Sequence, residues 1–351
     1  MEIIDLRSDT MTQPTETMRE AMAKAEVGDD VFDEDPTIHR LQDLAAETMG
    51  KQAALFLPSG TMGNLVSLLT HCQRGEEVLL GDMSHIFLNE VGGLAALGGI
   101  HPRTIPNRED GTLPLDELEK AIRPQDLHYP PTRLICLENT QNYCFGSPLS
   151  PPYMDSVADL ARRYGLKLHI DGARIFNAAV ALSVDVQEIT RQADSVMFSL
   201  SKGLSAPVGS IISGDREWIE KARKWRKMLG GGMRQAGHLA AAGVVALEEM
   251  VERLKEDHQN ARDLAQGLKR MTGIRIDPEK NRTNILFFEL DHPEVSPEAF
   301  LQKAEDRGIK MLLMEGGLFR AVLNRMVKRE HVPVVLKFAE EILGKDGDQK
   351  V

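Results

Sequence analysis

The stretch Ser195-Val-Met-Phe-Ser-Leu-Ser-Lys-Gly-Leu-Ser-Ala-Pro-Val-Gly209 places one lysine, Lys202, at the polar end of an apolar run. The run over residues 196–200 predicts a short buried strand, and the small residues after it keep bulk away from the ammonium group. Burial lowers the pKa of an amine toward neutrality, which Schiff-base chemistry with an aldehyde requires. The alternative is a lysine whose ammonium group reaches water from the strand end.

A second stretch, Leu166-Lys-Leu-His-Ile-Asp-Gly-Ala-Arg-Ile-Phe176, ends another apolar strand in an acidic residue, Asp171. In parallel sheets, ligand-binding groups gather at the carboxyl ends of the strands. If the two strands are parallel neighbours, Asp171 and Lys202 face one crevice. The acid suits a protonated pyridine nitrogen and the amine suits an aldehyde, so the pair indicates pyridoxal phosphate (PLP) as the cofactor.

The composition of the 351-residue chain is that of a globular protein, with 42% hydrophobic and 27% charged residues. The formal charge of −11, without a basic cluster, argues against a nucleic-acid partner and favours a small metabolite. Cys72, Cys136 and Cys144 are odd in number and lack metal-ligand spacing, so we expect a reducing compartment, no disulfide framework and no metal site. The sequence shows no leader-like N-terminus and no membrane-spanning segment, so we expect a cytoplasmic protein.

Strand-like and helix-like segments alternate along most of the chain, which predicts an α/β fold with a mainly parallel sheet and helices on both faces. The expected strands of this sheet cover residues 53–57, 77–80, 132–137, 166–170, 196–200 and 209–213. A long helical pattern over 235–271 leads into a compact α+β module. We predict a large domain over residues 1–240, including the N-terminal segment, and a small C-terminal domain over 241–351.

Further stretches are candidates for ligand contacts. A helix opens at Ser59-Gly60-Thr61, where free N–H groups suit a phosphate, although an ordinary strand-to-helix turn has the same pattern. His85 follows a strand and can lie flat over a bound ring, or it can simply begin a helix. Arg234 follows a glycine run that is either a hinge or a ligand-contacting turn, and its guanidinium group can reach a phosphate. The acidic residues 28–36 are interpreted as a solvent-facing loop.

Several motifs, in this order, resemble those of the low-specificity L-threonine aldolases, which are PLP enzymes of the aspartate-aminotransferase-like fold (fold type I). The resemblance covers nearly the whole chain and is looser in the C-terminal module. The most specific matches are Asp5-Leu-Arg-Ser-Asp-Thr, Val27-Gly-Asp-Asp-Val, Pro58-Ser-Gly-Thr-Met, His169-Ile-Asp-Gly-Ala-Arg-Ile-Phe-Asn, Leu200-Ser-Lys-Gly-Leu and Lys227-Met-Leu-Gly-Gly-Gly-Met-Arg-Gln.

The resemblance implies how the cofactor is held. Lys202 is similar to the lysine that binds the cofactor aldehyde, Asp171 to the partner of the pyridine nitrogen, and His85 to an imidazole stacked on the ring. The turn similar to the family's phosphate-binding turn consists of Ser59, Gly60 and Thr61. Arg234 is implied to approach the phosphate from a neighbouring subunit, and the resemblance implies a homotetramer built from tight dimers.

The resemblance also implies the substrate contacts. Arg174 is expected near the phenolic oxygen of the cofactor and the substrate carboxylate, which Ser8 and Arg320 also bind. The chain departs from the family pattern at Gln141, where the family has a histidine near the substrate's β-hydroxyl, and at Phe32, where it has a tyrosine. A glutamine orients a hydroxyl by hydrogen bonding but takes no proton at neutral pH, so these changes bear on substrate preference and rate.

The expected activity is retro-aldol cleavage of L-threonine or L-allo-threonine to glycine and acetaldehyde, with Lys202, His85 and Asp171 as catalytic residues. His85, directly or through water, removes the hydroxyl proton. A close alternative keeps the fold and the cofactor but cleaves a bulkier β-hydroxy amino acid or eliminates a β-substituent. A more distant alternative is a catalytically silent PLP-binding protein, since the change at Gln141 can mark lost chemistry.

Overall fold

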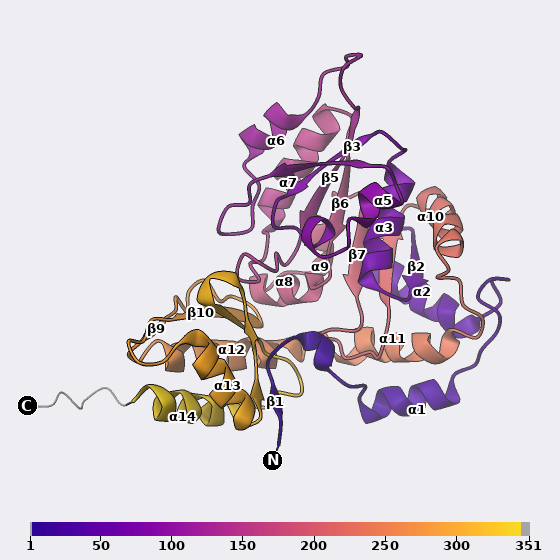
Figure 1. Ribbon diagram of the computed structural model, residues 1–351. Coiled ribbons are helices and arrows are strands. Elements are labelled where there is room, and N and C mark those ends of the chain that lie inside the picture. The colour runs from indigo at the N-terminus through magenta and orange to yellow at the C-terminus, as the bar shows by residue number, and fades with distance from the viewer. Residues whose placement is uncertain (1, 345–351) are drawn as a thin grey trace, which may run out of the picture.

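A central sheet of seven strands organises the molecule (Figure 1). The computed structural model describes residues 2–344. The strand order is β2-β8-β7-β6-β5-β3-β4; β8 runs antiparallel to both of its neighbours, and the remaining adjacent pairs are parallel. The strands are β2 (Ala53–Leu57), β3 (Glu77–Gly81), β4 (His101–Ile105), β5 (Thr132–Glu138), β6 (Lys167–Asp171), β7 (Ser195–Ser199) and β8 (Ser210–Gly214). The predicted mainly parallel sheet is confirmed.

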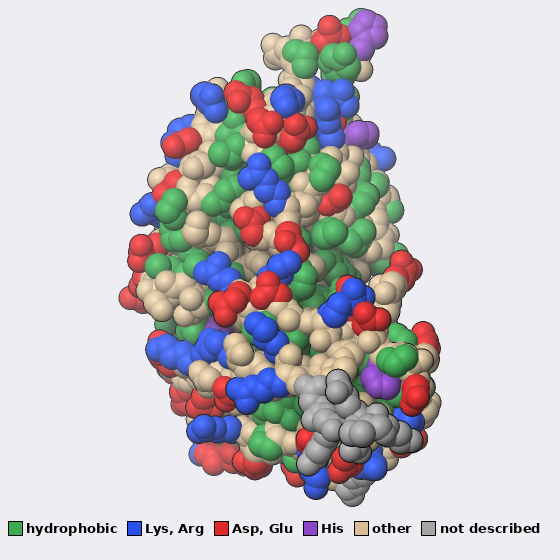
Figure 2. Space-filling model, turned by 90° about the vertical axis from the view of Figure 1, so that its left-hand side faces the viewer, with side chains coloured by type: hydrophobic (Ala, Val, Ile, Leu, Met, Phe, Trp, Pro, Cys, Tyr) green, Lys and Arg blue, Asp and Glu red, His purple; other side chains and the backbone are tan. Residues whose placement is uncertain are grey.

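Helices cover both faces of this sheet (Figure 1). They are α1 (Glu16–Lys24), α2 (Pro36–Met49), α3 (Gly60–His71), α4 (His85–Leu88), α5 (Gly93–Ala96), α6 (Leu115–Ala121), α7 (Pro151–Arg163), α8 (Ile175–Leu182), α9 (Val186–Thr190), α10 (Arg216–Met228) and α11 (Gly237–Glu249). Across residues 2–344, no helix is long and apolar enough to cross a membrane. On the face shown in Figure 2, acidic and basic side chains are interspersed rather than gathered by sign.

The sheet is buried on both faces because successive side chains of its strands point into different apolar clusters. In β2, Phe56 packs in the largest cluster, while Leu55 and Leu57 pack on the other face with residues of α3 and α10. In β3, Leu79 and Val78 are divided between two clusters in the same way. The short apolar runs of the sequence therefore supply two cores, one on each side of the sheet.

The C-terminal part of the chain forms a smaller antiparallel sheet with its own core, at the lower left of Figure 1. The strand order in this sheet is β12-β13-β10-β9. The elements are α12 (Leu254–Leu268), β9 (Ile274–Arg275), β10 (Ile285–Leu290), α13 (Pro297–Asp306), β11 (Ile309–Lys310), β12 (Leu312–Leu313), a 3-10 helix (Glu315–Gly317), β13 (Leu318–Val322) and α14 (His331–Leu343). The N-terminal strand β1 (Ile4–Asp5) pairs in parallel with β11, and Leu6 packs in the same core. The division into domains 1–240 and 241–351 stays a prediction.

The helical pattern over residues 235–271 forms two helices, α11 and α12, separated at residues 250–253. α11 is apolar on nearly all sides and packs against α1 and α2. α12 instead turns Leu264 and Leu268 into the core of the C-terminal module. The two helices serve different cores, so the chain changes direction between them. The edge strand β4 is a further element that the sequence did not reveal, since its residues are mostly polar or partly exposed.

The acidic loop over residues 28–36 is solvent-facing only in part: residues 32–34 are exposed, but two of its acids are buried. Asp30 is buried, and its carboxylate lies 2.9 Å from Nη2 of the buried Arg226 in α10. Asp35 is buried as well and accepts hydrogen bonds from two N–H groups at the start of α2 and from the N–H of Gly237. These acids are needed inside the protein because they compensate a guanidinium group and helix N-termini.

Candidate active site

A cavity of about 330 Å³ lies where β5, β6 and β7 end and where β13 of the C-terminal module approaches the central sheet. The cavity is lined by Ser8, Thr10, His85, Asn89, Glu138, Asn142, Tyr143, Ala173, Arg174, Lys202 and Arg320. Five of the predicted site residues are in this lining: Ser8, His85, Arg174, Lys202 and Arg320. Asp171 is buried beside them at the end of β6, and it is paired with Met197 of β7, so the two strands are parallel neighbours as predicted.

Lys202 lies three residues beyond the end of β7, in a turn that the N-terminal segment holds in place. Its carbonyl accepts hydrogen bonds from Oγ1 of Thr12, at 2.8 Å, and from the N–H of Ser205, at 2.9 Å. Burial and the neighbouring Arg174 guanidinium lower the pKa of the Lys202 amine, while nearby carboxylates act in the opposite direction. A lowered pKa favours the neutral amine, which is the nucleophilic form.

Asp171 is held by two hydrogen bonds at the carboxyl end of β6. Its Oδ1 accepts from the N–H of Ala173 at 3.1 Å, and its Oδ2 accepts from Nδ2 of Asn64 at 2.8 Å. These two bonds fix the orientation of the carboxylate at the end of the strand. Because each carboxylate oxygen can accept more than one hydrogen bond, Asp171 retains capacity for another donor, such as a pyridinium N–H.

His85 begins α4, just beyond β3, between two carboxyl groups. The backbone N–H of His85 donates to Oε2 of Glu138 at 2.7 Å, and the ring nitrogen Nδ1 lies 2.8 Å from Oε1 of Glu90. The hydrogen bond to Glu90 raises the pKa of His85, although burial opposes it. Burial, followed by the nearby charge of Asp171, raises the pKa of Glu138 to about 7. With Nδ1 engaged by Glu90, the second ring nitrogen, Nε2, is available to a ligand in the cavity.

Two arginines from distant parts of the chain meet at the cavity. Arg174 forms a bidentate ion pair with the buried Asp9, with distances of 2.8 Å from Nε to Oδ2 and 2.7 Å from Nη2 to Oδ1. Oδ1 of Asn142 accepts from Nη2 of Arg320 at 2.7 Å and from Nη1 of Arg174 at 3.4 Å. One amide oxygen therefore links the central sheet to β13 of the C-terminal module.

The two guanidinium groups differ in how their charge is balanced. Burial alone would raise the pKa of the Asp9 carboxyl, but Arg174 lowers it to about 2, which makes a strong ion pair. Burial and the nearby Arg174 lower the pKa of Arg320 to about 10. Within the described residues, Nε of Arg320 has no hydrogen-bond partner, and its terminal nitrogens bond to neutral oxygens. An anionic ligand, such as a carboxylate, would supply the missing negative charge.

The turn from β2 into α3 presents hydroxyl and N–H groups at the start of a 12-residue helix. Ser59 caps α3, and Gly60 and Thr61 form its first turn. A Cβ atom added at Gly60 would lie 3.3 Å from Oγ of Ser199 and 3.5 Å from Oγ of Ser210, so the glycine lets the turn pack closely against these two buried serines. The positive end of the helix dipole lies at the same place. Ser199 therefore lies directly behind the predicted phosphate turn, although the sequence did not mark it as a site residue.

Gln141 is not part of the cavity lining given by the described residues. Its side chain is buried in the loop after β5, where Nε2 donates to the carbonyl of Met83 at 2.8 Å and Oε1 accepts from the N–H of Cys144 at 2.7 Å. Backbone groups therefore occupy both ends of the amide. A direct contact of Gln141 with the substrate hydroxyl stays a prediction.

Arg234 also lies away from the cavity within this chain. Its Nη1 lies 2.9 Å from Oδ2 of Asp29, and its guanidinium carbon lies 5.9 Å from the ring centroid of Phe32. The side chain of Arg234 is 56% exposed and Phe32 is 71% exposed. The two residues form an exposed pair, and contact with a phosphate across a subunit boundary stays a prediction.

Sequence reasoning missed the residues that hold the predicted ones in place. Glu138 is the last residue of β5 and Asn142 lies in the polar stretch that follows, where the exit of a strand gave a signal. Asn64 lies one turn into α3 and gave a weaker signal. Glu90 gave none, because it belongs to the segment between α4 and α5 and reaches the site only through the fold.

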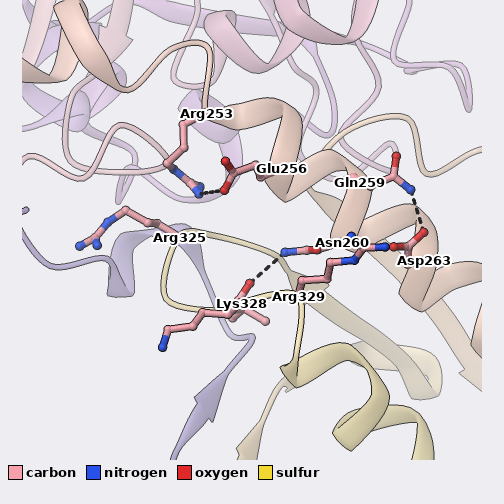
Figure 3. A pocket seen from close by; sticks show the side chains of 9 residues that line it. Arg253, Glu256, Gln259, Asn260, Asp263, Arg325, Lys328 and Arg329 are labelled. Atoms are coloured by element: carbon pink, nitrogen blue, oxygen red, sulfur yellow. Dashed lines mark hydrogen bonds and ion pairs between the residues drawn. The ribbon is translucent and has the colours of Figure 1, made fainter.

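A second cavity, of about 540 Å³, opens between α12 and the loop after β13 (Figure 3). Arg253, at one side of this cavity, lies 3.7 Å from Glu256 and pairs with the buried Asp257. The amide of Asn260 donates to the carbonyl of Val327 at 3.1 Å. The lining described for this cavity includes no predicted site residue. We therefore place the candidate active site at the smaller cavity.

Comparison with known proteins identifies relatives along nearly the whole chain. The family model of the beta-eliminating lyases matches residues 5–291. The probable low-specificity L-threonine aldolase 2 of Arabidopsis thaliana is 52% identical over 343 residues, which cover 97% of each chain. The low specificity L-threonine aldolase of Escherichia coli (strain K12) is 46% identical over 333 residues, which cover 95% of this chain and 97% of the relative. The chain belongs to the low-specificity L-threonine aldolase family.

Solved structures with lower identity share the fold of this family member. The threonine aldolase of Leishmania major matches it with a TM-score of 0.83 at 18% identity, covering 97% of this chain and 100% of that chain. An SPT structure with PLP matches with a TM-score of 0.76 at 19% identity, covering 98% of this chain and 89% of that chain. The predicted fold, that of the fold type I PLP enzymes, is confirmed.

Proposed function

We propose that this member of the L-threonine aldolase family is a PLP-dependent aldehyde-lyase that cleaves L-threonine and L-allo-threonine to glycine and acetaldehyde. The observation that carries the proposal is the cavity at which Lys202 and Arg320 meet, beside Asp171. These residues offer an amine with a lowered pKa for an aldehyde, a cation for a carboxylate and an acid for a ring nitrogen. The names of the relatives support the choice of threonine as substrate.

The residues around the cavity fit PLP. Asp171 would hold the protonated pyridine nitrogen, Lys202 would bind the aldehyde, and His85 would lie over the ring. The phosphate would lie at the start of α3, where the groups offered to it belong to Ser59, Gly60 and Thr61. When bound, PLP supplies an electron sink for the pair released as the Cα–Cβ bond breaks.

The substrate carboxylate would be held by Arg320 and Arg174, with the hydroxyl of Ser8 in the same lining. Asn142 already links the two guanidinium groups, so their positions are fixed before the substrate arrives. A charge-assisted hydrogen bond contributes roughly 1.5–3 kcal/mol. Fixing the carboxylate orients the substrate so that the bond to the β-carbon, rather than another bond at Cα, is the one that breaks.

His85 would accept the proton of the substrate's β-hydroxyl on Nε2, directly or through a water molecule. Glu90 engages Nδ1, and this leaves Nε2 for the acceptor role. The pKa of His85 is raised by the same contact, which makes the imidazole a stronger base. The hydroxyl proton thus moves to Nε2 as the carbonyl of acetaldehyde forms.

A second candidate reaction is elimination of a β-substituent, which the description of the matching family as beta-eliminating lyases favours. The two reactions use the same cavity but release different products. An aldolase gives glycine and an aldehyde, whereas elimination from threonine gives ammonia and a 2-oxo acid. A larger aldehyde, as from a phenylserine-like substrate, would still come with glycine.

The family resemblance further supports a homotetramer in the cytoplasm, with Arg234 reaching a phosphate in a neighbouring subunit. The exposed pair of Arg234 and Phe32 lies on the loop that the buried Asp30 and Asp35 hold in place. A rigid loop that presents an exposed cation and an aromatic ring suits a subunit contact. Light scattering of the purified protein tests this proposal, which a stable monomer would contradict.

Product analysis tests the proposed reaction. Purified protein with PLP is given L-threonine, L-allo-threonine and phenylserine, and Lys202→Ala serves as the control. We expect glycine and the matching aldehyde from wild type and neither from the control. Ammonia and a 2-oxo acid without glycine would identify an eliminating lyase. A cofactor absorbance without any product would identify a silent PLP-binding protein.

A further inference from the structure

A buried hydrogen-bond chain begins at Asp171 and runs away from the cavity. Nδ2 of Asn64 lies 2.8 Å from Oδ2 of Asp171 and 2.8 Å from Oε1 of Glu90. Oδ1 of the same amide lies 3.3 Å from Nε2 of His169. One asparagine therefore bridges two carboxyl groups and one imidazole.

The hydrogen-bond chain continues through residues of β6 and β7 to α3. Nδ1 of His169 lies 2.8 Å from Oγ of Ser195, and the same hydroxyl lies 2.7 Å from Nε2 of His71. His71 stacks on Trp218, with 5.0 Å between the ring centroids. Asn64, His169 and Ser195 are fully buried, and the proposed reaction makes no direct use of them. Polar groups buried at this depth cost stability unless every partner is satisfied.

The donor and acceptor roles along these hydrogen bonds follow from Asp171, where the series begins. A carboxylate accepts hydrogen bonds, so the amide nitrogen of Asn64 faces the acids and its oxygen faces His169. His169 must then donate from Nε2. Burial lowers the pKa of His169 to about 3, so the ring is neutral and its Nδ1 accepts from the hydroxyl of Ser195. That hydroxyl in turn accepts from Nε2 of His71.

We propose that Asn64 is a positioning residue that couples Asp171 to Glu90 and, through Glu90, holds His85 with its proton on Nδ1 and with Nε2 free toward the cavity. The inference deepens the proposed function, because it rests on His85 as the base. Each N–H of the Asn64 amide donates to one carboxyl group, and the bond to Glu90 opposes the rise that burial causes in the pKa of Glu90. An ionised Glu90 then stabilises a proton on Nδ1 of His85, which lies 2.8 Å away.

Four charged groups face His85 from the elements around it. Glu90 lies in the segment after α4, Asp171 at the end of β6, Glu138 at the end of β5 and Lys202 after β7. The hydrogen bond to Glu90 contributes most to the raised pKa of His85; Asp171 acts in the same direction, and Lys202 opposes it. Any change in the charge of Glu90 therefore changes the pKa of His85 with a predictable sign.

Asn64→Leu tests the coupling, because it removes both N–H donors from a side chain of similar size. Without those donors Glu90 takes up a proton more readily, and its contact with His85 weakens. We expect the pKa of His85 to fall by about 0.5 pH unit or more, in the same direction as in Glu90→Gln. The pKa is measured by NMR titration of His85 in the cofactor-free protein. In the PLP-loaded enzyme the acidic limb of kcat/KM should move to lower pH with it.

Asn281→Leu is the matched control, since Asn281 is also buried but its amide bonds to the backbone of Asp277 and Phe287. We expect this variant to leave the titration of His85 unchanged, even if it lowers stability. If Glu90→Gln moves the pKa of His85 and Asn64→Leu does not, the proposed coupling is overturned.

The wild-type protein gives a test that does not depend on the folding of a variant. The nitrogen chemical shifts of its imidazoles should show His169 protonated on Nε2 and His85 protonated on Nδ1 when neutral. The opposite tautomer of His169 would mean that the Asn64 amide is turned around, and the proposal would fail. Failure of the proposed reaction can be told apart from failure of the coupling. If no glycine is released but both tautomers are as expected, the proposed reaction is wrong and the coupling stands.

Discussion

Asp9 and Arg174, 165 positions apart in the sequence, form a buried bidentate ion pair at the cavity. Asp9 begins the short 3-10 helix Asp9–Met11, one residue before Thr10 of the cavity lining, and Arg174 precedes α8. Nδ2 of Asn284, just before β10, also donates to Asp9 at 3.3 Å. The N-terminal segment, the central sheet and the C-terminal module therefore meet at one carboxylate.

The ion pair predicts an acid-sensitive contribution to stability. Burial would raise the pKa of Asp9, but Arg174 lowers it from 3.8 to about 2. A carboxyl group whose pKa is depressed in the folded state stabilises it above the unfolded-state pKa, and this stability is lost as the pH falls through the folded-state value. The difference corresponds to roughly 2 kcal/mol. Between about pH 5 and pH 2, the free energy of unfolding of wild type should therefore fall more than that of Asp9→Asn.

Urea unfolding of both proteins across this range measures the difference. Asp9→Asn is expected to be less stable than wild type at neutral pH, because it leaves Arg174 without its charged partner. An equal loss of stability with falling pH in the two proteins would contradict the assignment of the acid-sensitive step to Asp9.

Lys202 should be the residue that carries the cofactor. Its amine lies at the cavity with a lowered pKa, so it is the nucleophile expected to bond to the cofactor aldehyde. Borohydride reduction of the PLP-loaded protein followed by peptide mass mapping should place the cofactor on Lys202. Lys51, whose pKa is also lowered by burial, provides an internal control because its ammonium group bonds to the carbonyls of Thr190 and Ala193. A label on Lys51 instead would overturn the site.

The adjacency of Asp171 and Lys202 was predictable because both follow apolar strands, and parallel strands present their carboxyl ends at one edge of the sheet. Alternation of strands and helices also predicted the sheet itself. The meeting of Arg174 with Arg320 was not predictable from pattern, since it depends on how the C-terminal module docks. Arg320 was predicted from the resemblance to a family. Asn142, which links Arg174 to Arg320, was identified only in the structure.

Polar residues in loops were the hardest to interpret. The acidic composition of residues 28–36 suggested solvent, yet Asp30 and Asp35 are buried because Arg226 and the start of α2 require acceptors. Glu90 had no signal at all, since a lone carboxyl group between two four-residue helices looks like a surface residue. The burial of such a charged residue can be predicted only when the position of its partner in the fold is known.

Arg320→Ala and Arg234→Ala should separate substrate binding from cofactor retention. Arg320 lines the cavity without an acidic partner among residues 2–344, so its loss should raise KM by about 10–100-fold, the cost of one charge-assisted hydrogen bond. Arg234 lies away from the cavity and is proposed to reach a phosphate in a neighbouring subunit, so its loss should instead weaken cofactor retention, measured by dialysis, with KM changed far less. The reverse pattern would show that the two roles are exchanged.

The amide of Gln141 is engaged by the backbone rather than by the cavity. Gln141→Ala would leave the carbonyl of Met83 and the N–H of Cys144 without these hydrogen bonds. An unsatisfied buried group costs about 1–3 kcal/mol, so we expect a lower Tm. If Gln141 has no direct contact with the substrate, glycine release should fall by less than about tenfold at a temperature where the variant is folded.

Gln141→His then distinguishes a structural glutamine from a lost base. An imidazole can replace one of the two backbone hydrogen bonds, so we expect a moderate loss of stability and a modest change in the preference between L-threonine and L-allo-threonine. A general base contributes about 10²–10⁴-fold to a rate. A gain of that size, with a new ionisation in the pH profile of kcat/KM, would mean that His85 is not the base of the native enzyme. Steady-state kinetics on both diastereomers across pH decides between the two, because a structural Gln141 predicts the same ionisations in both proteins.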